Sequence, residues 1–276
     1  MSKLISLFFL APVLRGFVAI LISGAAFPLC GVMVLKLNLV PLRYMLMHGV
    51  ILGGAIALAA NLPMVPAIVI VNIVLVILML VFSKNSGFGF SGTSAATMVL
   101  SMAAASLITH ISGVPAKDSL SLLWGSPFAL SIYDIIFIAI LATGLLIYTI
   151  LNFKNILSLF FSAEISKANG INVLFHYTFM IFIVALVVAL AMKLLGAFMI
   201  DSILILPALI AAKFQKIIKR EGIKRLFVFS SLAGFFCSLF GYVIAVALDF
   251  PPAATIAVLS GILYVILSIF TARKRG

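Results

Sequence analysis

Charged residues are scarce in this chain, and acidic residues most of all. Only 9% of the 276 residues are charged, and Asp and Glu together number six. A soluble domain of this length needs far more charge to cover its surface, so that class is excluded. With only six acidic residues, the chain has few candidates for catalytic carboxylates. The sequence has no phosphate-binding loop of the form G-x-x-x-x-G-K-[ST] and no His-Glu-x-x-His motif, so we expect neither an enzyme nor a chain that hydrolyses ATP itself.

Cysteine is nearly absent as well. Cys30 and Cys237 both lie in apolar runs, and neither has a second Cys or a His at the spacing of metal ligands. We expect both thiols to be reduced and buried packing residues. A disulfide framework and a cysteine-based zinc site are therefore excluded.

Apolar residues are abundant, at 65% of the chain. One membrane-spanning helix needs about 20 mainly apolar residues. We predict an all-α integral membrane protein with one domain over residues 1–276. We expect the residues before the first span to form an interfacial lead-in rather than a cleaved signal peptide. The stretch 113–131 is too polar to span comfortably and is predicted to be a re-entrant or interfacial helix. The nine predicted spans are 17–35, 44–60, 64–82, 94–112, 132–151, 174–192, 195–212, 226–247 and 253–271.

The basic residues predict the orientation, because cytoplasmic loops of membrane proteins are enriched in Lys and Arg. With the N-terminus outside and the C-terminus inside, 14 of the 18 Lys and Arg residues fall on the cytoplasmic side. The net charge of +12 is therefore interpreted as a topology determinant rather than as a nucleic-acid site. The basic cluster from Lys213 to Arg225 could also bind anionic lipid headgroups or contact a partner, and we interpret it as a topology determinant with some lipid contact. The cytoplasmic set is Lys36, Arg43, Lys84, Lys154, Lys167, Lys213, Lys216, Lys219, Arg220, Lys224, Arg225, Arg273, Lys274 and Arg275, and the remainder is Lys3, Arg15, Lys117 and Lys193.

The stretch 191–212 is long enough to span the membrane, but it contains charged residues and residues that break helices. It contains Lys193 and Asp201, and a charge at membrane depth is costly unless it faces water or a partner. Pro207 lacks a backbone donor, so we expect it, together with Gly196, to break the helix. We interpret this stretch as part of a transport path, with Asp201 at depth and Lys193 at the outer edge.

His48 lies in the short span 44–60. A neutral histidine can ligate a borderline metal or relay a proton, and the alternative is a histidine that is hydrogen-bonded to a neighbouring helix or lies near the interface. Gly49 and Gly53 follow at a spacing that lets helix backbones approach closely. We expect that pair to pack helices inside one subunit.

The predicted cytoplasmic loop 152–173 is too apolar for a bare connection, and its stretch 156–161 is too short to span. Ser162 is expected to cap a short helix that begins near Glu164 and ends at Gly170. Such an amphipathic element either docks a soluble motor or rests on lipid. The residues alone leave both readings open.

Four blocks of sequence together carry a family resemblance. They are the Gly/Ala-rich first span with Lys36 and His48 after it; Leu123-Trp-Gly-Ser-Pro127 with Tyr133-Asp134; Ser162-Ala-Glu-Ile-Ser-Lys-Ala-Asn-Gly170; and Ala191-Met-Lys, Leu195-Gly-Ala and Leu204-Ile-Leu-Pro-Ala208. In these blocks the chain resembles the permeases of ABC importers for zinc, manganese and iron. The resemblance extends over essentially the whole length.

The resemblance implies a fold similar to vitamin B12-type (type II) importer permeases, in a bacterial plasma membrane and without a cofactor. It implies a homodimer, or a pair of related permeases, with the path at their interface. A cytoplasmic ABC ATPase dimer and an extracytoplasmic metal-binding protein would be the other partners. Residues 153–171 would contain the coupling helix, with Glu164, Ala168 and Gly170 at matching positions. Asp118 and Trp124 would face the delivery protein.

The chain departs from the family pattern at the predicted path. Family members commonly have an acid four positions before the histidine that matches His48, and here that position is Tyr44. Conversely, Asp201 stands where relatives often have a small or hydroxylated residue. We predict that His48, Tyr44 and Asp201 line the path and that His48 and Asp201 are transient metal ligands. Either the acid has moved to another helix, or the cargo is not a bare divalent cation.

Two other classes of function remain open. The chain could be a secondary transporter or channel that works without a motor, or an assembly protein without a transport path.

Overall fold

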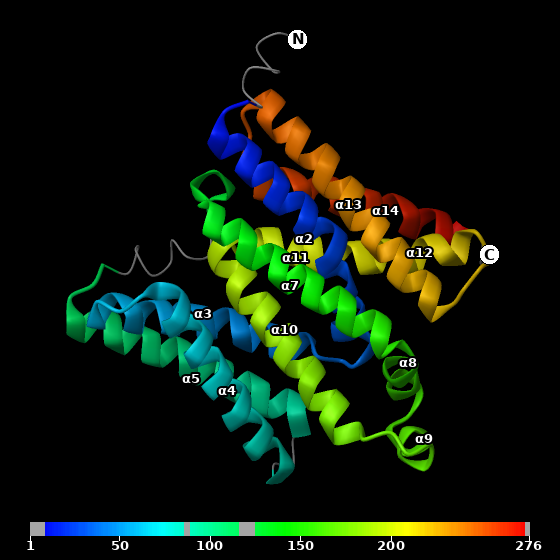
Figure 1. Ribbon diagram of the computed structural model, residues 1–276, viewed down its shortest axis with the longest axis horizontal. Coiled ribbons are helices and arrows are strands. Elements are labelled where there is room, and N and C mark those ends of the chain that lie inside the picture. The colour runs from blue at the N-terminus through cyan, green and yellow to red at the C-terminus, as the bar shows by residue number, and fades with distance from the viewer. Residues whose placement is uncertain (1–8, 86–88, 116–124, 274–276) are drawn as a thin grey trace. The chain divides into compact units, whose positions relative to one another are not determined.

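The computed structural model describes residues 9–85, 89–115 and 125–273 of the chain. Within these ranges every regular element is helical (Figure 1). Several predictions concern residues outside them: the charges of Lys3, Lys117, Lys274 and Arg275, the roles of Asp118 and Trp124, and most of the helix expected at 113–131. The helices are α2 (Ala11–Lys36), α3 (Val40–Ala60), α4 (Met64–Asn85), α5 (Gly89–Ser112), η1 (a 3-10 turn, Pro127–Ala129), α7 (Ile132–Leu151), α8 (Phe153–Phe161), α9 (Ala163–Ala168), α10 (Val173–Leu195), α11 (Ala197–Leu204), α12 (Leu206–Ile217), α13 (Ile223–Leu248) and α14 (Pro252–Arg273).

Nine segments of the described chain are long and apolar enough to cross a membrane, and α11 with α12 forms one of them, Ala197–Ile217. The prediction of an all-α membrane protein with nine spans is confirmed. Most helices are longer than the predicted spans, because helical hydrogen bonding continues past the apolar stretch. Arg15 therefore lies within α2. Arg43, which we expected in a loop, lies in the first turn of α3 and is only 4% exposed.

The chain divides into two compact units. The first contains Met1–Met33, Ser126–Ile171 and Phe198–Gly276, and the second contains Val34–Gly125 and Asn172–Ala197. Helix α2 therefore begins in the first unit and ends in the second. We call them the α13 unit and the α3 unit, after the helix that packs on most neighbours in each.

In the α3 unit, α3 packs against α4, α5 and α10. The contact with α4 depends on two small residues. A Cβ atom on Gly53 would lie 2.7 Å from Ile68 Cα, and one on Gly49 would lie 2.5 Å from the Oδ1 atom of Asn72. The glycines therefore allow the two backbones to approach. The expectation that this pair packs helices inside one subunit is confirmed.

In the α13 unit, α13 contacts α12 and α14, and polar bonds join it to α2. The Ser231 hydroxyl donates to the Ala25 carbonyl, and the Tyr242 hydroxyl donates to the Val13 carbonyl at 2.7 Å. Between these two bonds Gly234 lies directly on the Gly24 carbonyl. Helices α2 and α13 are thus held together along much of their length.

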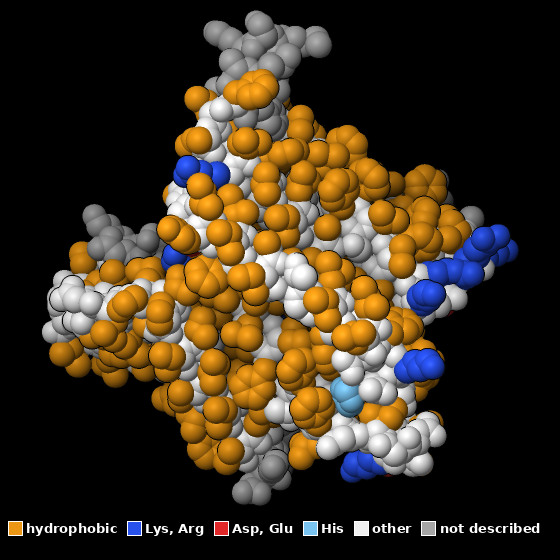
Figure 2. Space-filling view, in the orientation of Figure 1, with side chains coloured by type: hydrophobic (Ala, Val, Ile, Leu, Met, Phe, Trp, Pro, Cys, Tyr) orange, Lys and Arg blue, Asp and Glu red, His pale blue; other side chains and the backbone are white. Residues whose placement is uncertain are grey.

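The surface of the chain is that of a membrane protein. Only 11% of the α14 span is buried, and exposed Val258, Ile262 and Phe270 lie on it. Figure 2 shows hydrophobic side chains over most of the visible face, with Lys and Arg side chains near the turn that joins α12 to α13. Hydrocarbon, not water, is the solvent that such a surface requires.

Candidate functional site

His48 lies on a part of α3 that the bundle does not cover completely. Its ring is half-buried, and the Nδ1 atom lies 2.8 Å from the carbonyl oxygen of Tyr44, one turn earlier. A carbonyl oxygen can only accept, so Nδ1 carries the proton in this bond. In the neutral ring Nε2 then has the free lone pair, and its orientation is fixed through Tyr44. Such a nitrogen can ligate a metal or accept a proton.

The position four residues before His48, where the family resemblance leads us to expect an acid, is occupied here by an aromatic ring beside a cation. Tyr44 is 43% exposed, and the Cζ atom of Arg43 lies 4.3 Å from the centre of its ring. A guanidinium over an aromatic face is an attractive pair. Tyr44 lies one turn before His48 on α3, and its backbone carbonyl accepts the hydrogen bond that orients the His48 ring. A phenol therefore stands where a carboxylate was expected.

Asn72 is a polar residue of this region that the sequence reasoning missed. It is 1% exposed in the middle of α4, and its Nδ2 atom donates to the Ile68 carbonyl at 3.0 Å. Its Oδ1 atom faces Gly49, the residue after His48, and has no hydrogen-bond partner among the described residues. A lone amide in the apolar run Val71-Asn-Ile73 is the signal that could have found it.

Gly196 separates α10 from α11. Its φ is +91°, which only glycine adopts readily, and its N–H donates to the Met192 carbonyl at 2.8 Å. Gly125, at φ +57°, lies against it so closely that a Cβ atom there would be 2.6 Å from Gly196 Cα. The chain turns at Gly196, and two backbones touch there without side chains between them. Lys193 is half-buried in the last turn of α10.

The second interruption lies between α11 and α12, at Ile205. Pro207 occupies the first turn of α12 and cannot donate to the preceding turn. The break packs on α2 at Gly31, where a Cβ atom would be 2.7 Å from the carbonyl carbon of Leu204 and closer still to its oxygen. Asp201 lies one turn before the break and is half-buried, and its backbone carbonyl accepts from the Ile205 N–H at 3.1 Å.

His48 belongs to the α3 unit and Asp201 to the α13 unit. Across the residues that the structure describes, no three His, Cys, Asp or Glu side chains come together to hold a metal ion. A structural zinc site uses four ligands, and a catalytic site three. The chain by itself therefore offers isolated donor groups rather than a complete coordination sphere.

Residues 153–168 form two short helices, α8 and α9. The Ser162 hydroxyl accepts from the N–H groups of Glu164 and Ile165 at 3.1 and 3.4 Å, which caps α9. After α9 the chain turns at Gly170, where φ is +74°. The predicted cap and the predicted turn are both confirmed. Glu164, Ala168 and Gly170 are exposed, whereas Ser166 is buried and its hydroxyl lies 2.8 Å from that of Ser158 on α8.

Helix α8 is attached to α13 by aromatic rings. Phe160 stacks on Phe227 with ring centroids 6.1 Å apart and an interplanar angle of 6°, and Phe153 meets the same ring edge-on at 5.9 Å. Phe227 is 4% exposed. Offset and edge-on pairs each add about 0.5–1.5 kcal/mol beyond burial. A force applied to the exposed α9 would therefore reach the first turns of a membrane-spanning helix through two contacts.

Comparisons with known proteins agree on one group. Residues 10–271 match the model of the ABC 3 transport family. The chain is 29% identical over 175 residues to the high-affinity zinc uptake system membrane protein ZnuB of Haemophilus influenzae, a match that covers 62% of this chain and 66% of that protein. A ZnuB of Buchnera aphidicola is 29% identical over 176 residues, covering 62% and 65%. The matched segments thus span just under two thirds of these relatives.

The fold also has a solved counterpart. The structure of PsaBC from Streptococcus pneumoniae in complex with Fab superposes with a TM-score of 0.81, covering 96% of this chain and 94% of that chain at 18% identity. At this identity the likeness concerns the arrangement of helices alone.

Proposed function

Because this chain belongs to the ABC 3 transport family, we propose that it is the membrane-spanning subunit of an ATP-driven importer whose cargo is a divalent metal ion. The family match over residues 10–271 is the observation that carries this proposal. The chain is a multi-pass protein of a bacterial inner membrane. ATP hydrolysis would occur on separate cytoplasmic subunits, and an extracytoplasmic binding protein would deliver the ion.

His48 is the residue that we propose as the first protein ligand of the cargo. Its Nε2 atom is a borderline donor, suited to zinc among the candidate ions, and zinc is also the ion in the names of the two ZnuB relatives. Asp201 would supply a carboxylate oxygen. A second copy of the chain would double both donors, which fits a path at the interface of a homodimer.

Incomplete coordination suits a transporter. An ion that is held by three or four protein ligands leaves slowly, whereas transport requires binding that is weak enough for release. One imidazole and one carboxylate per subunit would bind the ion only when the subunits are suitably arranged. Rearrangement would then remove ligands and free the ion.

We propose that α8 and α9 receive the motion of the ATPase. Their exposed residues Glu164, Ala168 and Gly170 would form the contact, and the rings of Phe153 and Phe160 on Phe227 would pass the displacement to α13. The excess of basic residues on this side supports the orientation with the N-terminus outside and the C-terminus in the cytoplasm.

The test is uptake of radiolabelled zinc by cells that express the chain with its neighbouring transporter genes. His48→Ala and Asp201→Asn should each lower the uptake rate at least tenfold at unchanged protein level. His110→Ala and Asp249→Asn are matched controls, since His110 is exposed in the last turn of α5 and Asp249 ends α13 in a left-handed conformation that Asn also adopts. Normal uptake in both test variants would refute the ligand assignment, and uptake independent of ATP would refute the importer class.

A further inference from the structure

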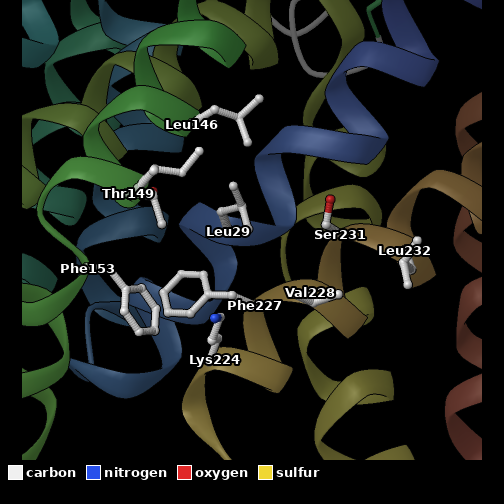
Figure 3. Close-up of a pocket in the computed structure, with 10 residues that line it drawn as sticks. Leu29, Leu146, Thr149, Phe153, Lys224, Phe227, Val228, Ser231 and Leu232 are labelled. Atoms are coloured by element: carbon white, nitrogen blue, oxygen red, sulfur yellow. The ribbon is translucent and has the colours of Figure 1, made fainter.

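The α13 unit contains a cavity of about 530 Å³, and two of its lining residues, Phe153 and Phe227, belong to the proposed coupling contact, whereas the cavity itself has no assigned occupant. Helices α2, α7 and α13 form its walls, with the start of α8 at one end (Figure 3). Leu29, Thr149 and Phe227 are buried at its floor, whereas Ile150 and Leu232 are 71% and 47% exposed at its rim. The cavity is therefore a groove that opens from the bundle toward the surroundings of α7 and α13.

The interior of the groove favours hydrocarbon. Only three of its lining side chains are polar: Thr149, Ser231 and Lys224. The Thr149 hydroxyl donates to the Leu145 carbonyl at 2.7 Å, and the Ser231 hydroxyl donates to the Ala25 carbonyl. Both hydroxyl protons are therefore used inside the protein. A polar solute or a hydrated ion would find few partners here, so the groove suits an apolar chain.

One end of the groove is positively charged. Lys224 lies at the end formed by Phe153 and Phe227, away from Leu146 (Figure 3). It belongs to the first turn of α13, which contains no acid, and Gly222 caps that helix without a side-chain hydrogen bond. A helix N-terminus attracts anions and disfavours cations. A negative charge bound here would therefore be stabilised both by the N-terminus of α13 and by the Lys224 ammonium.

The position of this charge matches the edge of the membrane. Helix α7 ends at Leu151 and α13 begins at Ile223, so the charged end of the groove lies where two membrane spans end together. The rest of the groove runs along the apolar parts of the same spans. Phospholipids have this same division, with a phosphate at the membrane edge and acyl chains below it.

We propose that the groove binds an anionic phospholipid, with one acyl chain between α2, α7 and α13 and the headgroup phosphate against the Lys224 ammonium. Basic pockets between membrane helices are a recognised site for anionic headgroups. The assignment depends neither on the cargo nor on the direction of transport. It requires only that α7 and α13 cross the membrane.

The test uses the full chain, purified and placed in nanodiscs of phosphatidylcholine. A trace of phosphatidylglycerol with a photoactivatable group on its acyl chain is added, and cross-linked peptides are identified by mass spectrometry. Labelling should concentrate on residues 146–153 and 224–232. The same probe with a phosphatidylcholine headgroup should label these peptides about fivefold less, the factor that corresponds to about 1 kcal/mol per basic residue at a membrane surface.

Two variants and a control separate the headgroup from the groove. Lys224→Ala should remove the preference for phosphatidylglycerol, while Lys216→Ala, an exposed residue of the same basic cluster outside the groove, should keep it within twofold. Leu146→Trp should fill the groove and lower labelling by both probes, with Lys224 still present. Elution as a single species in size-exclusion chromatography verifies that each variant is folded.

Three results would overturn the proposal. Equal labelling by both probes would remove the anionic specificity. Unchanged labelling by both probes in Leu146→Trp would mean that no acyl chain occupies the groove. Absence of label from both peptides, with cross-linking of Ile150→Cys between two chains, would mean that a second copy covers the groove.

Discussion

Replacing Gly31 by alanine tests how closely α2 must approach the break between α11 and α12. The added Cβ atom would lie 2.7 Å from the carbonyl carbon of Leu204, whereas ordinary contacts begin at 3.4 Å. The carbonyl carbon alone would require the two backbones to separate by about 0.7 Å, and the Leu204 oxygen, which lies closer still, requires more. Backbone cannot rotate away as a flexible side chain does, so we expect the cost of overpacking, about 1–3 kcal/mol.

The assay is the thermal stability of the detergent-solubilised chain, followed by the loss of the monodisperse peak of a fluorescent fusion. A loss of 1–3 kcal/mol corresponds to a midpoint lower by about 2–5 °C for a chain of this size. Zinc uptake should fall as well, because the displaced carbonyl belongs to the turn that follows Asp201.

Gly144→Ala and Gly261→Ala are the matched controls. Both glycines lie inside spans, and a Cβ atom on either would meet nothing within 4 Å. Alanine is the better helix former, so these midpoints should stay level or rise slightly. A Gly31→Ala midpoint within 1 °C of the parent, at a precision that separates the controls, would contradict the close contact.

Two further predictions concern α9. Gly170→Ala places a side chain at φ +74° and should destabilise the end of α9 by about 1 kcal/mol. The measurement is hydrogen exchange, and the backbone amides of residues 163–171 should exchange faster. The control is Gly222→Ala, at an extended φ of 168°, which should leave exchange over 163–171 unchanged. Ser166→Ala removes a hydroxyl that bonds the Ser158 hydroxyl and also donates to the Ser162 carbonyl at 2.9 Å, so it should cost about 1–2 kcal/mol. The double variant with Ser158→Ala should lose less stability than the sum of the two single variants, because both remove the bond between the hydroxyls. Additive losses would exclude that bond.

Features with a local cause could be predicted from the sequence. Runs of about twenty apolar residues fixed the number of spans, since the hydrocarbon thickness of a bilayer sets that length. Ser162 and Gly170 marked the ends of α9, because capping depends on residues only a few positions apart. Arg43 was misplaced for a related reason. Hydropathy places a span boundary at a charge, whereas the helix continues past it when the guanidinium finds an aromatic face.

The contacts that organise the candidate site arise from tertiary structure and were not predictable in this way. Nothing near Gly31 in the sequence indicates that Leu204 will lie against it, and nothing near Phe153 points to Phe227. Asn72 was overlooked because its apolar neighbours make α4 an unremarkable span. His48 and Asp201 could be chosen by chemical type, but their division between two units of the chain depends on how the helices assemble.

The contact between Gly125 and Gly196 also sets an order of events during synthesis. Both residues hold positive φ angles, and their backbones touch. Gly125 leaves the ribosome 71 residues before Gly196. At the usual 5–20 residues per second that interval is roughly 4–14 s. The contact with Gly196 can therefore form only after α10 has been synthesised. A translation pause after Gly125 would lengthen that interval, whereas a pause after Gly196 would not.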